Sequence, residues 1–323
     1  MGKTLSTDYT DYTDLRAGIL AEIRAQGPMT FRRYMELCLY HPRLGYYTSG
    51  KNRFGKAGDY YTSAQVGTLF ARLLARRFEQ MRRELGEDDF TVLEMGPGRG
   101  DFGRELKAAA PHLCYIPVEY GDSFPQASFT GCVFSNEFFD ALPVHSICNG
   151  HEMLVGERGG ELAWVEGPVS DHPGPEFCPD AEKWIRNFAA VLDRGYVLTV
   201  DYGYRGREVE RFPEGTLMSY RRHTALENVL ADPGERDITA HVNFDLLARA
   251  ASQAGLRETC FEPQSRYLMR LGEEDQFASV LAGSGSEAER TQAALQLKNL
   301  LFGIGETMRV LEMRKDFNSI HGI

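Results

Sequence analysis

The amino-acid sequence predicts an α/β fold in which helices cover both faces of a parallel β-sheet. Two observations support this prediction. From residue 90 onward, short apolar segments of strand length alternate with segments of helix length. A glycine-rich loop joins the first of these strands to the helix that follows it. Residues 1–88 show mainly helical patterning, so we expect an N-terminal helical part beside a second domain spanning 89–323.

The N-terminal part contains three helix signals. Asp14 caps a helix expected over 15–26, and Thr30 opens a second helix over 31–40. Between Ser63 and Leu85 apolar residues recur at steps of three and four, which predicts a long helix with one buried face. The tyrosine- and glycine-rich stretch before Ser63 has the composition of a loop, and we expect it to cover a ligand of the second domain.

The second domain begins with the alternating part of the chain. Apolar residues fill its strands without polar alternation, which is typical of strands buried on both faces of a parallel sheet. The predicted strands are 90–96, 114–120, 131–137 and 196–203, and the predicted helices are 101–110 and 181–192.

Other segments interrupt or follow this pattern. Two dipeptides typical of hairpin turns, Asn149-Gly150 and Gly159-Gly160, predict a small antiparallel insertion within 144–170. Charged, Gly- and Pro-rich residues 204–243 are expected to form a second, loop-like insertion, and we expect both insertions to lie on the substrate side. The remaining predicted elements are a helix over 244–254, strands near 256–261 and 266–271, and final helices after a linker at 283–287.

The composition argues against several classes of protein. The 323 residues carry a net charge of −10, whereas nucleic-acid binding needs a basic face. No apolar run reaches the roughly 20 residues of a membrane-spanning helix, and the acidic N-terminal segment fits neither a signal nor a transit peptide. Six scattered cysteines without metal-type spacing predict free thiols, no bound metal and a reducing, cytoplasmic location.

The glycine-rich loop is the strongest candidate site. Its glycines allow a ligand to approach the backbone, and the next helix offers its N-terminal N–H groups. Gly98, Gly100 and Gly103 fit a dinucleotide pattern, but that register leaves the preceding acid and first glycine unexplained. The second alternative for this loop uses the acid as well: an acid followed by GxGxG is the S-adenosylmethionine (SAM) loop of class I methyltransferases. The third alternative is a strand-to-helix turn that binds no ligand. The SAM register assigns cofactor contacts to Glu94, Gly96, Pro97, Gly98, Gly100 and Asp101.

Further side chains are candidates for the rest of the cofactor. A carboxylate at the end of the second strand is expected to hold ribose hydroxyls, and Glu119 stands at that position. Asp122 is a candidate for the adenine amino group. Thr62, before the long helix, is expected to close over the cofactor, unless it serves only to begin that helix.

The turn at 136–140 contains a second group of candidate site residues. The carboxyl ends of parallel strands meet at one edge of a sheet, so this turn should face the same crevice as the glycine loop. Asn136 is a candidate for both cofactor and acceptor, and Glu137 and Asp140 can hold an amine or guanidinium. The alternative is a structural turn with its two phenylalanines in the core, and we expect one of them to be buried.

Two more residues are candidates for the acceptor side. Asp201 ends the fourth strand, where an acid forms a turn about as often as it serves a site. His223 is either a base, because imidazole titrates near neutral pH, or a surface residue. For an arginine acceptor, Glu137 would orient the guanidinium and localise its charge away from the attacking nitrogen.

Several segments resemble the MidA-like class I methyltransferases, relatives of a mitochondrial enzyme that modifies an arginine of a respiratory complex I subunit. They lie between about residues 15 and 270 and include LEMGPGRGD, SNEFFDALPVH, VDYG and DPGERDITAHVNF. The resemblance implies a Rossmann-like SAM-binding domain with an N-terminal helical part over the cofactor, and a protein arginine as acceptor. It implies an acceptor side at Glu137, Asp140, Asp201, Tyr202 and His223, and cofactor contacts at 94–101 and Asn136.

The chain departs from this family, whose members usually carry a longer segment between the glycine loop and the turn at 136–140, including a strand, a helix and a further strand. Here only 16 residues separate Glu119 from Asn136. One explanation is that this chain lacks one βα unit of the family and that Glu119 is still the carboxylate that binds the ribose hydroxyls. The other is that residues 118–124 are the next strand and that the ribose acid is missing.

The sequence therefore predicts a SAM-dependent methyltransferase acting on a protein arginine, with a complex I subunit as a candidate partner. A small-molecule acceptor on the same fold, and a binding or assembly factor without catalysis, are the alternatives. We expect no nucleic-acid partner and no membrane span. The amphipathic helices allow either a monomer or a homodimer.

Overall fold

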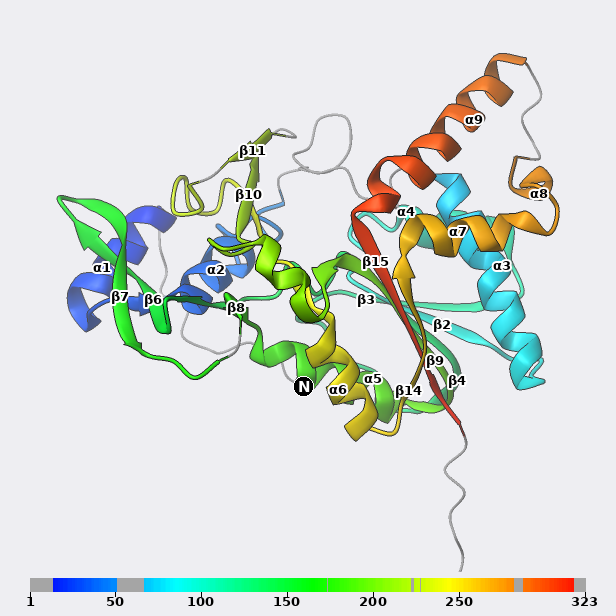
Figure 1. The fold of residues 1–323 in the computed structure, drawn as a ribbon, viewed down its shortest axis with the longest axis horizontal. Coiled ribbons are helices and arrows are strands. Elements are labelled where there is room, and N and C mark those ends of the chain that lie inside the picture. The colour runs from blue at the N-terminus through cyan, green and yellow to red at the C-terminus, as the bar shows by residue number, and fades with distance from the viewer. Residues whose placement is uncertain are drawn as a thin grey trace, which may run out of the picture.

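The computed structural model describes residues 14–50, 67–172, 174–221, 224–226, 228–281 and 287–316. Figure 1 shows two lobes side by side. The large lobe, on the right, is built on a seven-stranded sheet, and the small lobe, on the left, contains two helices and two small sheets.

The seven-stranded sheet has the order β14-β15-β9-β4-β2-β3, with β13 paired to β9. Its strands are β2 (Thr91–Met95), β3 (Cys114–Val118), β4 (Phe129–Asn136), β9 (Leu192–Tyr204), β13 (Val242–Asn243), β14 (Arg257–Pro263) and β15 (Met308–Lys315). β3, β2, β4, β9 and β13 pair in parallel, whereas β15 runs antiparallel between β9 and β14. The predicted α/β fold is confirmed, with a sheet that is mixed at one side.

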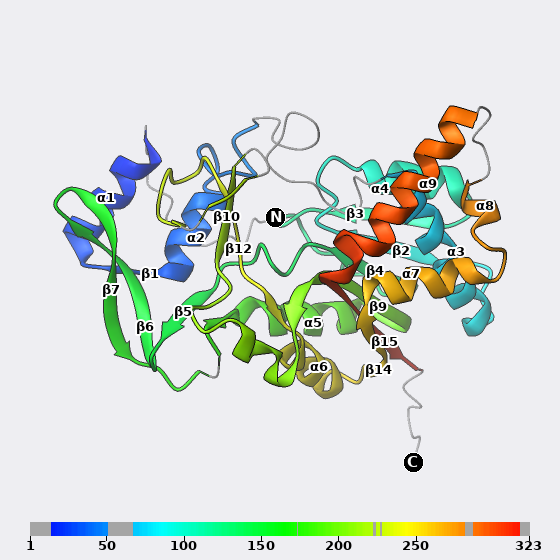
Figure 2. The same cartoon turned by 45° about the horizontal axis from the view of Figure 1, so that its top comes forward.

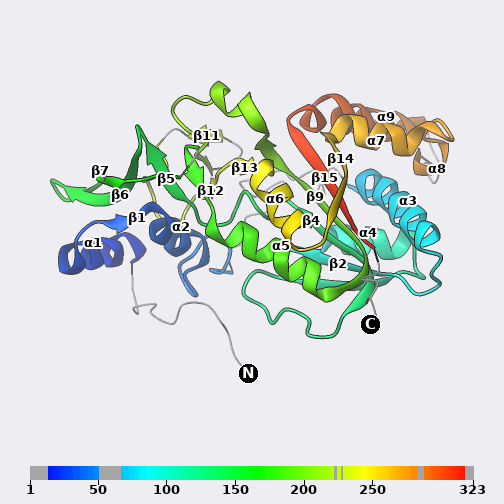
Figure 3. The same ribbon diagram turned by 60° about the horizontal axis from the view of Figure 1, so that its bottom comes forward.

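Helices cover both faces of this sheet, and Figure 3 shows α5 and α6 on the face opposite α3 and α4. The helices of the large lobe are α3 (Thr68–Leu85), α4 (Asp101–Ala109), α5 (Pro179–Val191), α6 (Phe244–Gln253), α7 (Gln264–Glu273), α8 (Ala278–Leu281) and α9 (Glu287–Phe302), with short 3-10 turns at Gly206–Arg211 and Ile304–Glu306. Among the helices of the described residues, none is long and apolar enough to cross a membrane.

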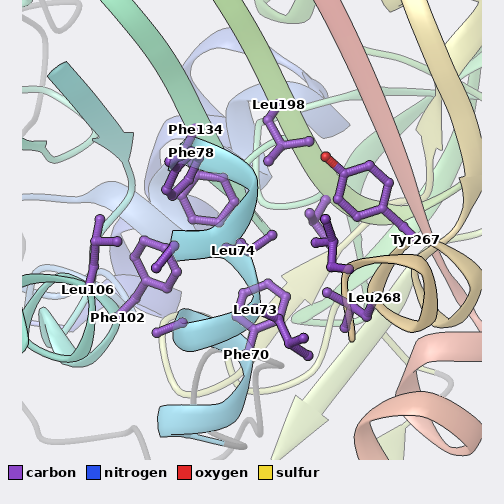
Figure 4. Packing of buried hydrophobic residues seen from close by; sticks show 14 of the residues in the cluster. Phe70, Leu73, Leu74, Phe78, Phe102, Leu106, Phe134, Leu198, Tyr267 and Leu268 are labelled. Carbon is purple, nitrogen blue, oxygen red and sulfur yellow. The ribbon is translucent and has the colours of Figure 1, made fainter. Parts of the chain in front are cut away.

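The apolar stripe predicted for the long helix lies on α3 and faces the sheet. Figure 4 shows Phe70, Leu74 and Phe78 of this helix beside Phe134 of β4 and Phe102 of α4. The rings of Phe102 and Phe134 are 4.7 Å apart, and all of these side chains are buried. α3 therefore packs with the large lobe, although its position in the sequence predicted that it belongs to the N-terminal part.

The small lobe combines the N-terminal helices with the insertions. Its elements are α1 (Leu15–Gln26), β1 (Met29–Thr30), α2 (Phe31–Tyr40), β5 (His145–Cys148), β6 (His151–Arg158), β7 (Glu161–Val169), β8 (Glu176–Phe177), β10 (Met218–Arg221), β11 (Thr224–Leu226) and β12 (Asp237–Thr239). The side chains of Asp14 and Thr30 cap α1 and α2 as predicted. The predicted antiparallel insertion is confirmed in β5, β6 and β7, and Figure 2 shows β10 and β12 beside α2.

Three predictions of secondary structure are wrong. Residues 266–271 form part of helix α7, because Tyr267, Leu268 and Leu271 are buried at helical spacing. Helix α9 follows the linker as predicted, but residues 308–315 after it form strand β15, inside the sheet between β9 and β14, where a further helix was expected. The loop-like segment 204–243 contains a three-stranded sheet, in which β10 pairs with β11 and β12.

β3 lies at the edge of the large sheet and pairs only with β2 among the described strands. The N–H of Cys114 and the carbonyl of Val118 both bond toward β2, so the intervening Pro117 faces the open edge, where its missing N–H costs nothing. After β3 the chain passes to β4 without another helix or strand. This topology agrees with a trimmed βα unit and leaves Glu119 at the end of the second strand.

Candidate active site

A cavity of about 260 Å³ lies at the carboxyl ends of β2, β3 and β4, and both lobes contribute to its wall. The large lobe contributes the glycine loop and the residues after β3 and β4. The small lobe contributes residues of α2, the loop that follows it and β12. Because β2 lies between β3 and β4, the strand order reverses here, which is where doubly wound folds bind ligands.

The glycine loop has a backbone conformation that favours glycine. Gly96, Gly98 and Gly100 have φ values of 66°, 54° and 70°, in the left-handed region. A Cβ at Gly98 or Gly100 would meet no atom within 4 Å, so the backbone there is open to a ligand. A Cβ at Gly96 would instead lie 3.2 Å from the ring of Phe138. The loop therefore fits a molecule lying against its backbone, as SAM binding requires.

Glu94 lies at the base of this loop and is 4% exposed. Burial raises the pKa of its carboxyl to about 7, and a hydrogen bond donated by the Tyr115 hydroxyl offsets part of the rise. A cationic group of a ligand would favour the ionised carboxylate. The predicted loop residues that line the cavity are Glu94, Gly96, Pro97, Gly98 and Asp101, whereas Gly100 is the N-cap of α4.

Glu119 and Asp122, the two residues predicted to contact the nucleoside of the cofactor, differ in their position relative to the cavity. Glu119 lies in the cavity wall, where its carboxylate accepts hydrogen bonds from the N–H groups of Gly98 and Tyr120, both at 3.2 Å. Asp122 lies outside the wall and accepts a 3.1 Å hydrogen bond from the N–H of Glu119. Asp122 thus caps the turn that holds Glu119, and no contact with adenine follows from its position.

The turn after β4 places the second group of candidate residues on the same cavity. Asn136 and Glu137 both line it, and the Asn136 amide donates a 3.0 Å hydrogen bond to the Glu137 carboxylate. Glu137 has φ 51°, unusual for a residue other than glycine, and its N–H bonds to the carbonyl of Val200 at 2.9 Å. Both Phe138 and Phe139 are buried, although we expected only one, and Phe138 also lines the cavity.

Two buried aspartates flank this turn. Asp140 is 3% exposed and lines the cavity, whereas Asp201 is fully buried outside the wall. The Asp201 carboxylate accepts hydrogen bonds from the N–H groups of Phe139 and Tyr202, at 2.9 Å each, and Asp140. Burial raises the pKa of Asp140 well above its usual range, and the nearby carboxylates of Asp201 and Glu137 raise it further. Asp201 therefore holds the turn in place and is not positioned to touch an acceptor.

The site residues that the small lobe contributes were not predicted individually from the sequence. Asp237 of β12 is 2% exposed, lines the cavity and accepts a 2.7 Å hydrogen bond from the Tyr47 hydroxyl. Tyr40 and Tyr47 also line the cavity, and the Tyr40 hydroxyl bonds to the carbonyl of Ala141 at 3.0 Å. The available signal was the DPGERDITAHVNF segment, which contains Asp237 but was assigned no site residue.

Two predicted site residues, Thr62 and His223, lie outside the described residues. Tyr202 is described but lies outside the cavity wall, where its ring stacks on His241 at 6.3 Å. Within the part of the chain that the structure describes, no three His, Cys, Asp or Glu side chains are grouped to hold a metal ion.

Comparisons of sequence point to one family. A model of S-adenosyl-L-methionine-dependent methyltransferases matches residues 103–261. The mitochondrial protein arginine methyltransferase NDUFAF7 homolog of Drosophila melanogaster is 26% identical over 337 residues, which cover 81% of this chain and 76% of that protein. The mitochondrial protein arginine methyltransferase NDUFAF7 of Homo sapiens is 25% identical over 380 residues, covering 95% of this chain and 82% of that protein.

Comparison of structures gives the same fold. A protein from Burkholderia thailandensis, solved with S-adenosyl-homocysteine bound, has a TM-score of 0.80 and 26% identity, with 93% of this chain and 92% of that chain covered. A native structure from the same organism has a TM-score of 0.76 and 25% identity, covering 93% and 91%. SAM is therefore the cofactor, and the open glycine backbone fits it.

The expectation of a cytoplasmic location is wrong, because the relatives are named as mitochondrial proteins. All six cysteines are free, as predicted, but free thiols fit any reducing compartment and do not identify one. The glycine loop and the acidic turn lie on one cavity, in a fold shared with a protein that binds S-adenosyl-homocysteine. On this evidence the chain is a class I SAM-dependent methyltransferase, similar to the MidA-like family that it resembles in sequence.

Proposed function

We propose that this methyltransferase transfers the methyl group of SAM to a guanidinium nitrogen of an arginine in a protein. The observation that carries the proposal is the turn after β4, which adds the carboxylates of Glu137 and Asp140 to the cavity lined by the glycine loop. The name of the relatives, protein arginine methyltransferase, supports the same acceptor.

The chemistry of the wall suits a guanidinium. This group presents five N–H donors in one plane and pairs with carboxylates through parallel hydrogen bonds. Its flat face also stacks on aromatic rings, and the wall includes the rings of Tyr40, Tyr47 and Phe138. Several carboxylates share this wall, and a cationic ligand gains more from them than a neutral small molecule does.

SAM supplies an activated methyl carbon, so the protein has to position the acceptor and manage one proton. Glu137 is placed for this task, because the amide of Asn136 and the backbone bond to Val200 fix the turn around it. Glu137 and Asp140 orient the guanidinium, and the Glu137 carboxylate accepts the one proton that the attacking nitrogen loses. The buried aromatic residues beside them keep water from the reacting atoms.

The test uses SAM labelled in its methyl group, mixed with the purified protein and with separate protein and metabolite fractions of a cell extract. We expect label in the protein fraction. Glu137→Gln should lower this transfer by about a hundredfold, because the acceptor loses its orientation, and should leave affinity for S-adenosyl-homocysteine unchanged. Glu105→Gln, on α4 and outside the cavity wall, is the matched control. Label confined to metabolites would overturn the proposal.

The resemblance to complex I assembly methyltransferases makes a complex I subunit the first protein to examine as substrate. Association of two chains into a homodimer stays a prediction, which sedimentation of the purified protein measures.

A further inference from the structure

Asp237 stands in the cavity wall but comes from a different lobe than Glu137 and Asp140. It begins strand β12, which pairs with β10 through Tyr220 opposite Asp237. The N–H of Ala240, just after β12, donates a 2.9 Å hydrogen bond to the carbonyl of Asp140. The position of Asp237 relative to the acidic turn is therefore fixed by backbone contacts and does not depend on a loop.

The carboxylate of Asp237 is also oriented. The Tyr47 hydroxyl donates to its Oδ1 at 2.7 Å. Tyr47 is in turn held between Tyr40, with ring centroids 5.6 Å apart, and Tyr46, whose ring meets it edge-on at 5.1 Å. This hydrogen bond restricts the orientation of the Asp237 carboxylate, which suits a group that pairs with a planar ligand.

Carboxylates of both lobes lie on this one cavity. Asp237 contributes to the raised pKa of Asp140, after burial, Asp201 and Glu137, so the carboxylates of the two lobes repel one another. An amide at position 237 could accept the Tyr47 hydrogen bond without this repulsion. The charge of Asp237, added to those of Glu137 and Asp140 on one cavity, fits a cationic ligand that contacts both lobes.

We infer that Asp237, positioned by Tyr47, is a second acceptor-binding acid that pairs with guanidinium N–H groups not taken by Glu137. The inference rests on the proposed function and adds a specificity residue to it. A guanidinium can bridge carboxylates on two elements with its separate N–H pairs. Citrulline has the same shape without the charge, and lysine offers a single ammonium, so both should bind more weakly.

The test measures binding of three labelled glycine-flanked peptides, with a central arginine, citrulline or lysine, to the full chain saturated with S-adenosyl-homocysteine. The wild-type protein should bind the arginine peptide about tenfold or more tightly than the citrulline peptide. Asp237→Asn should lower affinity for the arginine peptide by about ten- to a hundredfold. Affinity for the citrulline peptide and for S-adenosyl-homocysteine should stay within about twofold.

Two more variants separate binding from folding. Tyr47→Phe keeps the ring but removes the hydrogen bond, and should lower affinity for the arginine peptide by several-fold and leave the citrulline peptide unchanged. Asp232→Asn, in the segment before β12 and outside the cavity wall, is the matched control, because asparagine tolerates the φ of 49° there.

The outcomes are distinguishable. If Asp237→Asn and Tyr47→Phe both bind the arginine peptide as the wild type does, the role of Asp237 is overturned while the proposed function stands. If the wild type does not prefer arginine over citrulline, the proposed function fails, and the inference fails with it.

Discussion

The backbone N–H of Gly98 donates a 3.2 Å hydrogen bond to the carboxylate of Glu119, which closes the glycine loop onto the end of the neighbouring strand. The loop follows β2 and Glu119 follows β3, so one contact joins the parts of the site expected to hold the two halves of SAM. Asp122 supports this contact from outside the cavity. The trimmed segment after β3 has thus left a carboxylate at the expected position.

Glu119→Gln should weaken binding of S-adenosyl-homocysteine by about ten- to a hundredfold, because a charged acceptor in the wall becomes neutral. Asp122→Asn should change the affinity by about twofold at most, since Asp122 contacts only the turn. Calorimetric titration measures both. A larger loss in Asp122→Asn than in Glu119→Gln would exchange the two assignments.

Gly98→Ala should abolish tight binding of the cofactor while the protein stays folded. The methyl group would meet no protein atom and would stand in the space that the cofactor needs. Gly86→Ala is a matched control, because Gly86 has a φ of 67° and the same open surroundings, but lies at the end of α3. Each variant should lose about 1 to 2 kcal/mol of stability from backbone strain. Equal cofactor affinity in the two variants would contradict the assignment of the loop.

Glu94 should make the stability of the ligand-free protein depend on pH. Its pKa of about 7 in the folded protein lies above the ordinary value of 4.5, so the folded state binds the proton more tightly. The free energy of unfolding should therefore fall as pH rises from about 4.5 to 7, by roughly 3 kcal/mol at most. Urea unfolding at about pH 5.5 and 7.5 measures the change, and Glu94→Gln should remove this part of it. Identical pH dependence in both proteins would show that Glu94 does not titrate in this range.

Asp201→Asn should destabilise the protein by about 1 to 3 kcal/mol, because one of the N–H groups that Asp201 accepts would face an amide donor. Asp193→Asn, in the same strand, should cost about 0.5 kcal/mol or less, since Asp193 makes an exposed bond to Ser128. Denaturant unfolding compares them. Full stability together with lost activity in Asp201→Asn would mean that Asp201 touches the acceptor after all.

The parts of the fold that could be predicted depend on local signals. Asp14 and Thr30 cap helices by accepting hydrogen bonds from backbone N–H groups three residues later in the chain. The glycine loop can likewise be recognised from a few consecutive residues. β15 was missed because a charged residue, Glu312, lies in its buried centre. Two hydrogen bonds from Arg77, at 2.8 and 2.9 Å, offset that charge, and α3, which carries Arg77, is distant in sequence.

The same reasoning explains what could be predicted of the site. Glu94, Glu119 and Glu137 follow strands whose ends meet at one edge, so their convergence follows from the topology. Asp237 lies in a segment with the composition of a loop, and only its pairing with β10 and its bond to Tyr47 bring it to the cavity. Asp201 has the sequence position of a site residue, but its three backbone hydrogen bonds give it a structural role.

The most direct test of the account identifies the amino acid that receives the methyl group. A protein fraction labelled by the purified enzyme and methyl-labelled SAM is hydrolysed in acid, and the labelled amino acids are separated. The account predicts label in methylated arginine, and its loss when Glu137→Gln replaces the wild type. Label in methyl-lysine or in another amino acid, with none in arginine, would contradict it.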